Sequence, residues 1–174
     1  MKLQTRDDAI VLLKRLGAPS HLLRHVELVG EAADLLLSEL RAARISVSED
    51  FVRVGVVLHD VGKIHHPQEM SQPGSLHEPE GEKMLLEAGA PPDVARVCLS
   101  HARWGSMECS LEELLIALSD KLWKGVRRAD LEEAVIRNSG ERSGRDYWDL
   151  FVSMDSCFER IADEGAARLV RSTS

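Results

Sequence analysis

Apolar residues recur every three or four positions along nearly the whole chain, a period typical of amphipathic helices. The stretch from Ser20 to about Arg44 shows this best, because one of its faces is apolar and the opposite face is polar. The apolar face consists of Leu22, His25, Val26, Val29, Ala32, Ala33, Leu36 and Leu40, and the polar face of Glu27, Glu31, Asp34 and Ser38. We predict one long helix here, capped by Ser20.

Capping residues, glycines and prolines predict further helix boundaries. Three pairs have the spacing of a capping box: Thr5 with Asp8, Ser110 with Glu113, and Asp130 with Glu133. Gly17 is expected to end the first helix, and Pro79 and Pro91-Pro92 to begin two others. The segment from about Arg145 to Val170 is helical by pattern.

The residues from Phe51 to Leu58 are apolar on nearly every side, which predicts a buried helix, with a buried strand as the alternative. Gly62 is expected to stop this helix, and a loop should follow from Lys63 to about Leu76. The chain has no repeat and no long linker. We predict an all-α helical bundle, a single domain over residues 1–174 with its core at about 20–130 and a C-terminal helix at 145–170 that caps the bundle or forms a dimer.

Composition narrows the class of protein. Hydrophobic residues make up 44% of the 174 residues and charged residues 29%, so the chain should fold around a core. No apolar run reaches the roughly 20 residues of a membrane span. The first 17 residues contain two acids, Asp7 and Asp8, where a secretory signal would need basic and then apolar residues. The three cysteines form no CxxC pair, and Cys98 shares a face with Val94 and Val97 as a core residue would. We expect a cytoplasmic protein.

The charge of the chain limits its partners. The 22 Lys and Arg against 29 Asp and Glu give a formal net charge of −7. A field of this sign repels a nucleic-acid backbone and so argues against bulk nucleic-acid binding. A small anionic substrate remains compatible with it, provided that the site itself is locally positive.

Several histidines lie where a hydrophobic residue is expected. His25 lies in the middle of the apolar face of its helix, and His101 shares a face with Val94, Val97 and Cys98. His59 and Asp60 end the most hydrophobic segment of the chain. A buried imidazole or carboxylate costs free energy unless it is hydrogen-bonded or bound to an ion. A single histidine of this kind is explained as a core residue that is hydrogen-bonded to a backbone carbonyl. Three such histidines with carboxylates beside them indicate a metal site instead.

Asp120 is a less obvious candidate, because it points away from the leucine stripe of its helix. Ile116 and Trp123 flank it on the same side, so that this helix could lie between the core and a cleft. Nitrogen and oxygen donors without thiolates suit iron or manganese, and Mg, Ni, Co or Zn are compatible with them. Their number would also serve two ions that share one carboxylate.

The ordered set His25, His59-Asp60, His77, His101 and Asp120 resembles the HD-domain superfamily of metal-dependent phosphohydrolases, over about residues 20–130. The segment VVLHDVGKI carries the most specific part of the resemblance. The resemblance implies a helical bundle with a central site. It implies that His25, His59, Asp60 and Asp120 hold one metal ion, and that Asp60 bridges to a second ion held by His77 and His101. His65 or His66 competes with His77 as the ligand.

The resemblance also implies hydrolysis of a phosphate ester or anhydride, with a nucleotide as the expected substrate, by a hydroxide that bridges the metal ions. Asp60 would orient this hydroxide, and Lys63 would offset phosphoryl charge. Other candidate substrate-binding residues are Arg103, Trp104 and Lys124, followed by Lys121, Arg127 and Arg128, most of which are expected on solvated faces. Trp104 and Trp123 could each stack on a base or pack in the core.

Two departures from the family pattern bear on the substrate. The nucleoside monophosphatases of the family carry a glutamate where this chain has Lys63, and the cyclic-dinucleotide class carries a Gly-Tyr-Pro signature, whereas Tyr147 lies in another context. Two alternatives to a phosphohydrolase stay open: a di-iron oxygenase with the same ligand order, and a non-catalytic HD domain that senses nucleotides or binds a partner.

Overall fold

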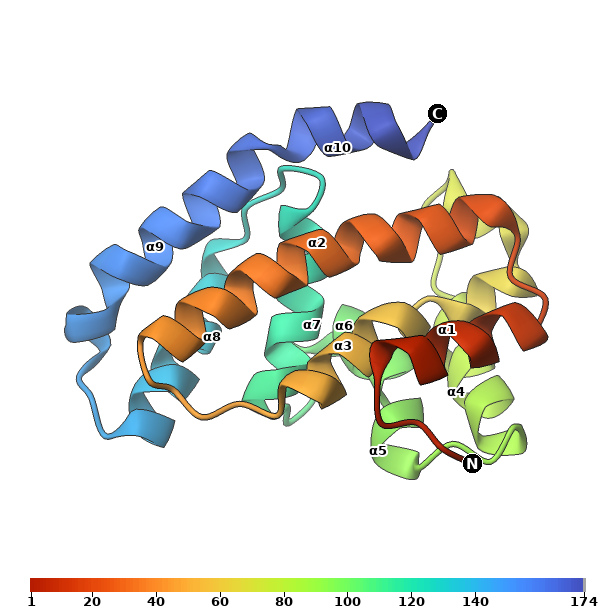
Figure 1. Cartoon of the computed structure of the whole chain (residues 1–174), viewed down its shortest axis with the longest axis horizontal. Coiled ribbons are helices and arrows are strands. Elements are labelled where there is room, and N and C mark those ends of the chain that lie inside the picture. The colour runs from red at the N-terminus through yellow and green to blue at the C-terminus, as the bar shows by residue number, and fades with distance from the viewer. Residues whose placement is uncertain (174) are drawn as a thin grey trace.

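The computed structural model describes residues 1–173, which form helices and no strand. The elements in chain order are α1 (Arg6–Arg15), α2 (Ser20–Ala42), α3 (Glu49–Leu58), the 3₁₀ turns η1 (Val61–Ile64) and η2 (Pro67–Met70), α4 (His77–Glu87), α5 (Pro92–Ala95), α6 (Val97–Arg103), α7 (Leu111–Leu122), α8 (Ala129–Ser143), α9 (Tyr147–Asp163) and α10 (Gly165–Ser172) (Figure 1). The prediction of an all-α fold is confirmed.

Two of the three expected capping boxes are present. Thr5 caps α1 and Ser110 caps α7, each with reciprocal side-chain and backbone hydrogen bonds to the acidic residue three positions on. The third is wrong, because α8 begins at Ala129 with Arg128 as its N-cap, and Asp130 lies inside the first turn. Ser20 is likewise the first residue of α2, whose N-cap is Pro19.

Several predicted segments are divided by turns. The expected loop from Lys63 to Leu76 contains the end of η1 and the whole of η2, and the helix expected after Pro92 is split at Arg96 into α5 and α6. The C-terminal helix is split at Glu164 into α9 and α10. The helix through Asp120 ends at Leu122, and a turn with Gly125 at φ +82° follows.

Gly62 has a different role from the one expected. The helix α3 already ends at Leu58, and Gly62 lies within η1. A Cβ at this position would lie 1.9 Å from the carbonyl oxygen of His77 and 2.7 Å from the backbone nitrogen of Gly81. Only glycine therefore allows the turn after Asp60 to contact the backbone of α4 this closely.

Two apolar clusters form the core, and α2 and α3 contribute to both. The larger cluster joins α2 and α3 to α7, α8 and α9, and the smaller one joins them to α1 and α4–α6. Cys98 is fully buried in the smaller cluster, as expected, with Sγ 3.5 Å from the carbonyl oxygen of Leu58. Burial also raises the pKa of its thiol, so Cys98 acts as a small core residue.

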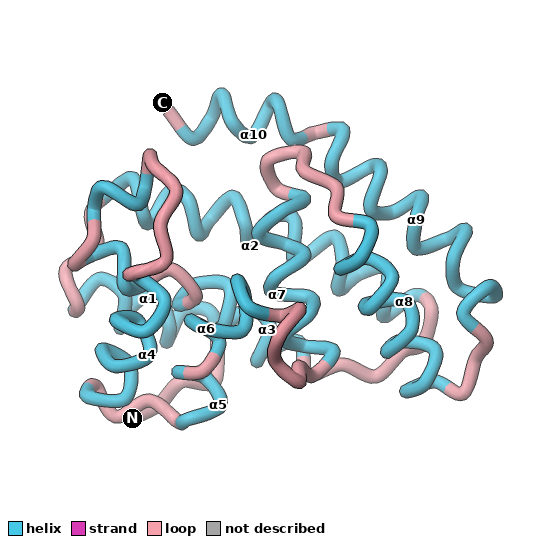
Figure 2. The backbone as a smooth tube through the Cα atoms, turned by 180° about the vertical axis from the view of Figure 1, so that it is seen from behind, coloured by secondary structure: helices cyan, strands magenta, loops and turns pink. Residues whose placement is uncertain are grey.

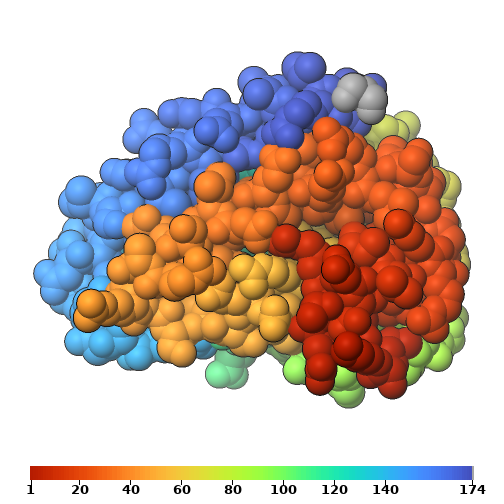
Figure 3. Space-filling model, in the orientation of Figure 1, coloured from red at the N-terminus to blue at the C-terminus, as the bar shows by residue number. Residues whose placement is uncertain are grey.

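The C-terminal helices pack against α2 and lie along one edge of the molecule (Figure 3). Seen from behind, the turn between α7 and α8 passes beneath the junction of α9 and α10 (Figure 2). Within residues 1–173, no helix is both long enough and apolar enough to cross a membrane.

Candidate metal centre

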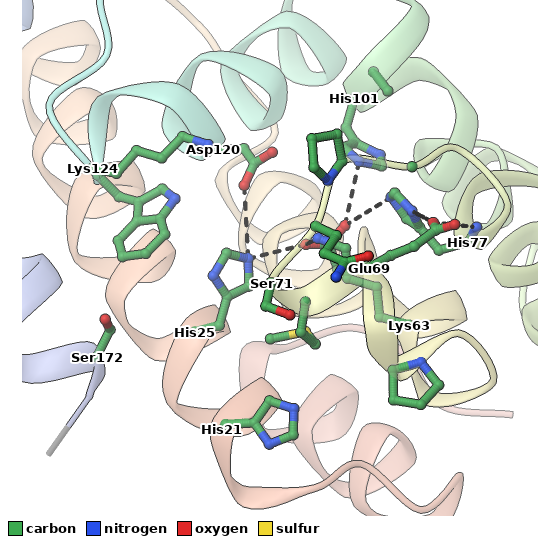
Figure 4. Close-up of a pocket in the computed structure, with 18 of the residues that line it drawn as sticks. His21, His25, Lys63, Glu69, Ser71, His77, His101, Asp120, Lys124 and Ser172 are labelled. Carbon is green, nitrogen blue, oxygen red and sulfur yellow. Dashed lines mark hydrogen bonds and ion pairs between the residues drawn. The ribbon is translucent and has the colours of Figure 1, made fainter.

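Five helices bring the predicted ligands together at the boundary of the two core clusters. His25 comes from the second turn of α2, His59 and Asp60 from the end of α3, and His77 from the start of α4. His101 lies on α6 and Asp120 near the end of α7. Except for His59, which is fully buried beneath it, these residues line one cavity of about 900 Å³ (Figure 4).

One group of four residues surrounds a point between α2, α3 and α7. One ligand atom from each of His25, His59, Asp60 and Asp120 lies within 4.8 Å of the others. Nε2 of His25 is 3.0 Å from Oδ2 of Asp60 and 3.8 Å from Oδ1 of Asp120. Nε2 of His59 is 3.4 Å and 3.2 Å from the same two oxygens.

A second group lies on the other side of Asp60. Its Oδ1 atom is 3.3 Å from Nε2 of His77 and 3.4 Å from Nε2 of His101. One oxygen of Asp60 therefore belongs to each group, with His25 and Asp120 on one side in Figure 4 and His77 and His101 on the other.

Hydrogen bonds at the far side of three imidazole rings set which nitrogen of each ring faces Asp60. Nδ1–H of His59 donates to the carbonyl of Val56 at 2.7 Å, and that of His101 to the carbonyl of Val97 at 3.1 Å. Nδ1 of His77 lies 2.6 Å from Oε1 of Glu69. When such a ring is neutral and keeps its proton on Nδ1, the lone pair of Nε2 points toward Asp60, the arrangement that metal-binding histidines require.

Glu69 is the residue at this centre that the sequence analysis missed. Besides His77 Nδ1, its carboxylate accepts the backbone N–H groups of His77 at 3.0 Å and Leu76 at 3.2 Å. Burial would raise its pKa, but these donors outweigh burial and lower it. Neither His65 nor His66 lines the cavity, and His65 pairs with Glu80 at the surface. The structure thus places His77 beside Asp60.

His59, Asp60 and Asp120 stabilise one another's charged forms, but some polar atoms at the centre make no hydrogen bond. Burial would lower the pKa of His59, but the carboxylates of Asp60 and Asp120 raise it to about 10. Burial would likewise raise the pKa values of both carboxyls, and the charge of His59 holds them below their usual range. Nε2 of His25 and Oδ1 of Asp60 are buried, and although charged or polar atoms lie near them, neither makes a hydrogen bond of good geometry. Such atoms converging on one carboxylate fit divalent cations bound on both sides of it.

Three lysines and one tryptophan also line the cavity. Lys63 Nζ is 2.8 Å from Oδ2 of Asp60, and Lys121 and Lys124 line the same cavity. Trp123 is buried in the larger core cluster and also lines the cavity, with its ring edge-on to His25 at 5.0 Å between centroids. Asp120 faces the cavity, which agrees with the interpretation of its helix as lying between core and cleft.

The remaining candidates lie elsewhere. Arg103 and Trp104 line a smaller adjoining cavity, together with Arg128. Arg127 lines neither cavity, because it pairs with Glu132 at 2.7 Å and with Asp155 at 2.7 Å.

The C-terminal helix also belongs to the cavity wall, which the sequence did not indicate. Leu169 and Ser172 of α10 line the cavity. Arg168, only 1% exposed, donates to the carbonyls of Ile161 at 2.7 Å and Trp123 at 3.4 Å. Gly165 packs against Gly125 with no room for a Cβ. These contacts hold α10 on the end of α7, beside Trp123.

Comparison with protein families agrees with this centre. The family model of the HD domain matches residues 20–124, a segment that contains both ligand groups. No curated protein and no solved structure matches the chain. The match covers more than half of the 174 residues, and so the chain belongs to the HD domain family.

Proposed function

We propose that the protein is a metal-dependent phosphohydrolase that cleaves a phosphate ester or anhydride, with a nucleotide as the preferred substrate class and iron or manganese as the metal. The observation that carries the proposal is the position of Asp60, whose two oxygens each face a separate set of imidazoles. Two divalent cations bound at such a site would lower the pKa of a bound water and would neutralise charge on the phosphate. The three lysines and the one tryptophan that line the cavity support an anionic substrate with an aromatic part.

The side chains of the cavity have separable tasks. Lys63 pairs with Asp60 and lines the cavity, so that its ammonium can donate a further hydrogen bond to a phosphoryl oxygen. Lys121 and Lys124 place two further positive charges on the wall formed by α7 and the turn after it. The cavity of about 900 Å³ is within the usual range for small-molecule sites. In the overall reaction, one water adds to phosphorus, the phosphorus–oxygen bond to the leaving group breaks, and the leaving oxygen receives a proton.

A screen with metal-loaded protein tests this proposal. Purified protein is loaded with Mn(II) or Fe(II), and phosphate release is measured over nucleotides and simple phosphate esters. We expect turnover of at least one class, and loss of both metal and turnover in Asp60→Ala. Lys63→Gln should retain metal and lose turnover. Metal uptake without release of phosphate from any ester would contradict the proposal.

The same samples separate the two alternative functions. Oxygen consumption by the Fe(II)-loaded protein, without phosphate release, would favour a di-iron oxygenase. Tight nucleotide binding without turnover or oxygen consumption would favour a sensing domain. The three lysines that line the cavity favour phosphate chemistry, because a negatively charged group is what they would bind best.

A further inference from the structure

A second cavity of about 420 Å³ adjoins the metal centre. We refer to it as the side pocket, and its walls come from the end of α6, the segment after it, α7 and the start of α8. It shares His101, Ala102 and Lys121 with the larger cavity. A ligand at the metal centre is therefore next to the side pocket, with His101 and Lys121 between the two.

The side pocket is locally positive in a chain of net charge −7. Arg103, Lys121 and Arg128 line it, against the single carboxylate of Asp130. Arg103 pairs with Glu78 at 2.8 Å and Arg128 with Asp130 at 3.2 Å, while Lys121 has no ion pair within residues 1–173. Both arginine side chains are 44% exposed, so that each retains donors for a further anion.

An aromatic ring fixes the geometry of this cluster. Trp104 packs against the larger core cluster, which holds its ring in place. The guanidinium carbon of Arg128 lies 5.5 Å from the centre of that ring. A cation at this distance is attracted to the ring face, and a guanidinium has five N–H donors, so that this contact leaves donors available for a phosphate.

We propose that the side pocket binds a second phosphate group of the substrate while the reacting phosphate lies at the metal centre. The substrate class is then an organic phosphate with at least two phosphate groups, separated by the span from Asp60 to Arg128. This inference rests on the proposed function for the identity of the reacting group, but the binding of the second group is measurable without turnover.

A series of non-hydrolysable phosphonates provides the test. Calorimetry measures binding of α,ω-alkane diphosphonates with one to six carbons to Mn(II)-loaded protein, each against the alkylphosphonate of equal length. We expect at least one diphosphonate to bind more tightly than its monophosphonate. Arg128→Gln should weaken that diphosphonate about fivefold, the range of an exposed charge pair, and leave the monophosphonate unchanged. Arg128→Lys should recover part of the loss.

Arg137→Gln is the matched control, because Arg137 also pairs with an exposed carboxylate of α8 but lines neither cavity. It should change neither affinity. Equal weakening of both ligands by Arg128→Gln, or no diphosphonate preference at any length, would overturn the inference. Diphosphonate preference in a protein that releases no phosphate would contradict the proposed function alone, and turnover without that preference would contradict only the side pocket.

Discussion

Nδ1 of His77 lies 2.6 Å from Oε1 of Glu69, and both side chains are buried. The same carboxylate accepts the backbone N–H groups of Leu76 and His77. Glu69 therefore fixes the backbone of the irregular segment where α4 begins. Because it contacts Nδ1 of His77, it also leaves Nε2 as the nitrogen that faces Asp60. A partner of this kind raises the basicity of an imidazole and fixes its orientation before any metal arrives.

We predict that Glu69→Gln weakens metal binding at the side of Asp60 that carries His77 and His101. The amide retains the size of the carboxylate but loses its charge, and changes of this kind cost about 10–100-fold in metal affinity. Glu80→Gln is the control, since Glu80 pairs with His65 at the surface. Mn(II) titrations of the three proteins should show weaker binding of one ion in Glu69→Gln alone. Equal affinities in all three would contradict the assigned role of Glu69.

Gly62→Ala should destabilise the fold, because its methyl group would lie 1.9 Å from a backbone oxygen of α4. Relief of this overlap needs movement of α4 away from the turn after Asp60, and we expect a loss of about 2–3 kcal/mol in the free energy of unfolding. Gly105→Ala meets nothing within 4 Å and has no unusual φ, so it should be close to neutral. Urea denaturation measures the free energy of unfolding of both variants. Similar midpoints would contradict the close contact of Gly62 with the backbone of α4.

Arg168→Met tests how α10 is held on α7. The substitution keeps the aliphatic volume but removes the buried donors to the carbonyls of Ile161 and Trp123. Hydrogen bonds to charged groups contribute more than neutral ones, so we expect a destabilisation of about 2 kcal/mol. The control is Arg160→Met, because Arg160 is 67% exposed and its nearest carboxylate oxygen is 3.9 Å away. An unchanged midpoint of thermal unfolding in Arg168→Met would contradict the role of Arg168 in holding α10 against the end of α7.

Metal binding should release a proton at neutral pH. In the metal-free protein the pKa of His59 is raised from 6.5 to about 10, so its imidazole is charged at pH 7, and a coordinated imidazole must be neutral. The apparent affinity for Mn(II) should therefore increase with pH between 7 and 10. Conversely, the raised pKa stabilises the metal-free fold fully below pH 6.5, and this contribution is lost as the pH rises through 10. Calorimetry in buffers of different ionisation enthalpy counts the released protons, and a buffer-independent heat would contradict the prediction.

The sequence located those ligands whose position conflicts with their surroundings. His25, His59 and His101 lie on apolar helix faces, where a polar side chain is costly, and the structure directs all three at Asp60. His77 was indicated only through the family resemblance, because it follows an irregular segment in which no hydrophobic period exists. Glu69 lies inside that segment, and so no pattern distinguished it from a solvated acid.

Tertiary contacts explain what the sequence could not predict. Gly62 has the same appearance in a sequence whether it ends a helix or allows two backbones to meet, and only the position of α4 decides between them. The place of α10 in the cavity wall depends on the contact of Gly165 with Gly125, 40 residues away along the chain. Arg127 and Arg128 are adjacent in the sequence, yet Arg128 lines the side pocket and Arg127 lines neither cavity.

The shared carboxylate of Asp60 is most directly tested by electron paramagnetic resonance of the protein titrated with Mn(II), together with elemental analysis. We expect two ions per chain whose spins are coupled through one bridging ligand. We expect one ion with an uncoupled signal in His77→Ala, and neither ion in Asp60→Ala. Two fully bound but magnetically independent ions in the wild type, or full metal content in Asp60→Ala, would contradict this expectation.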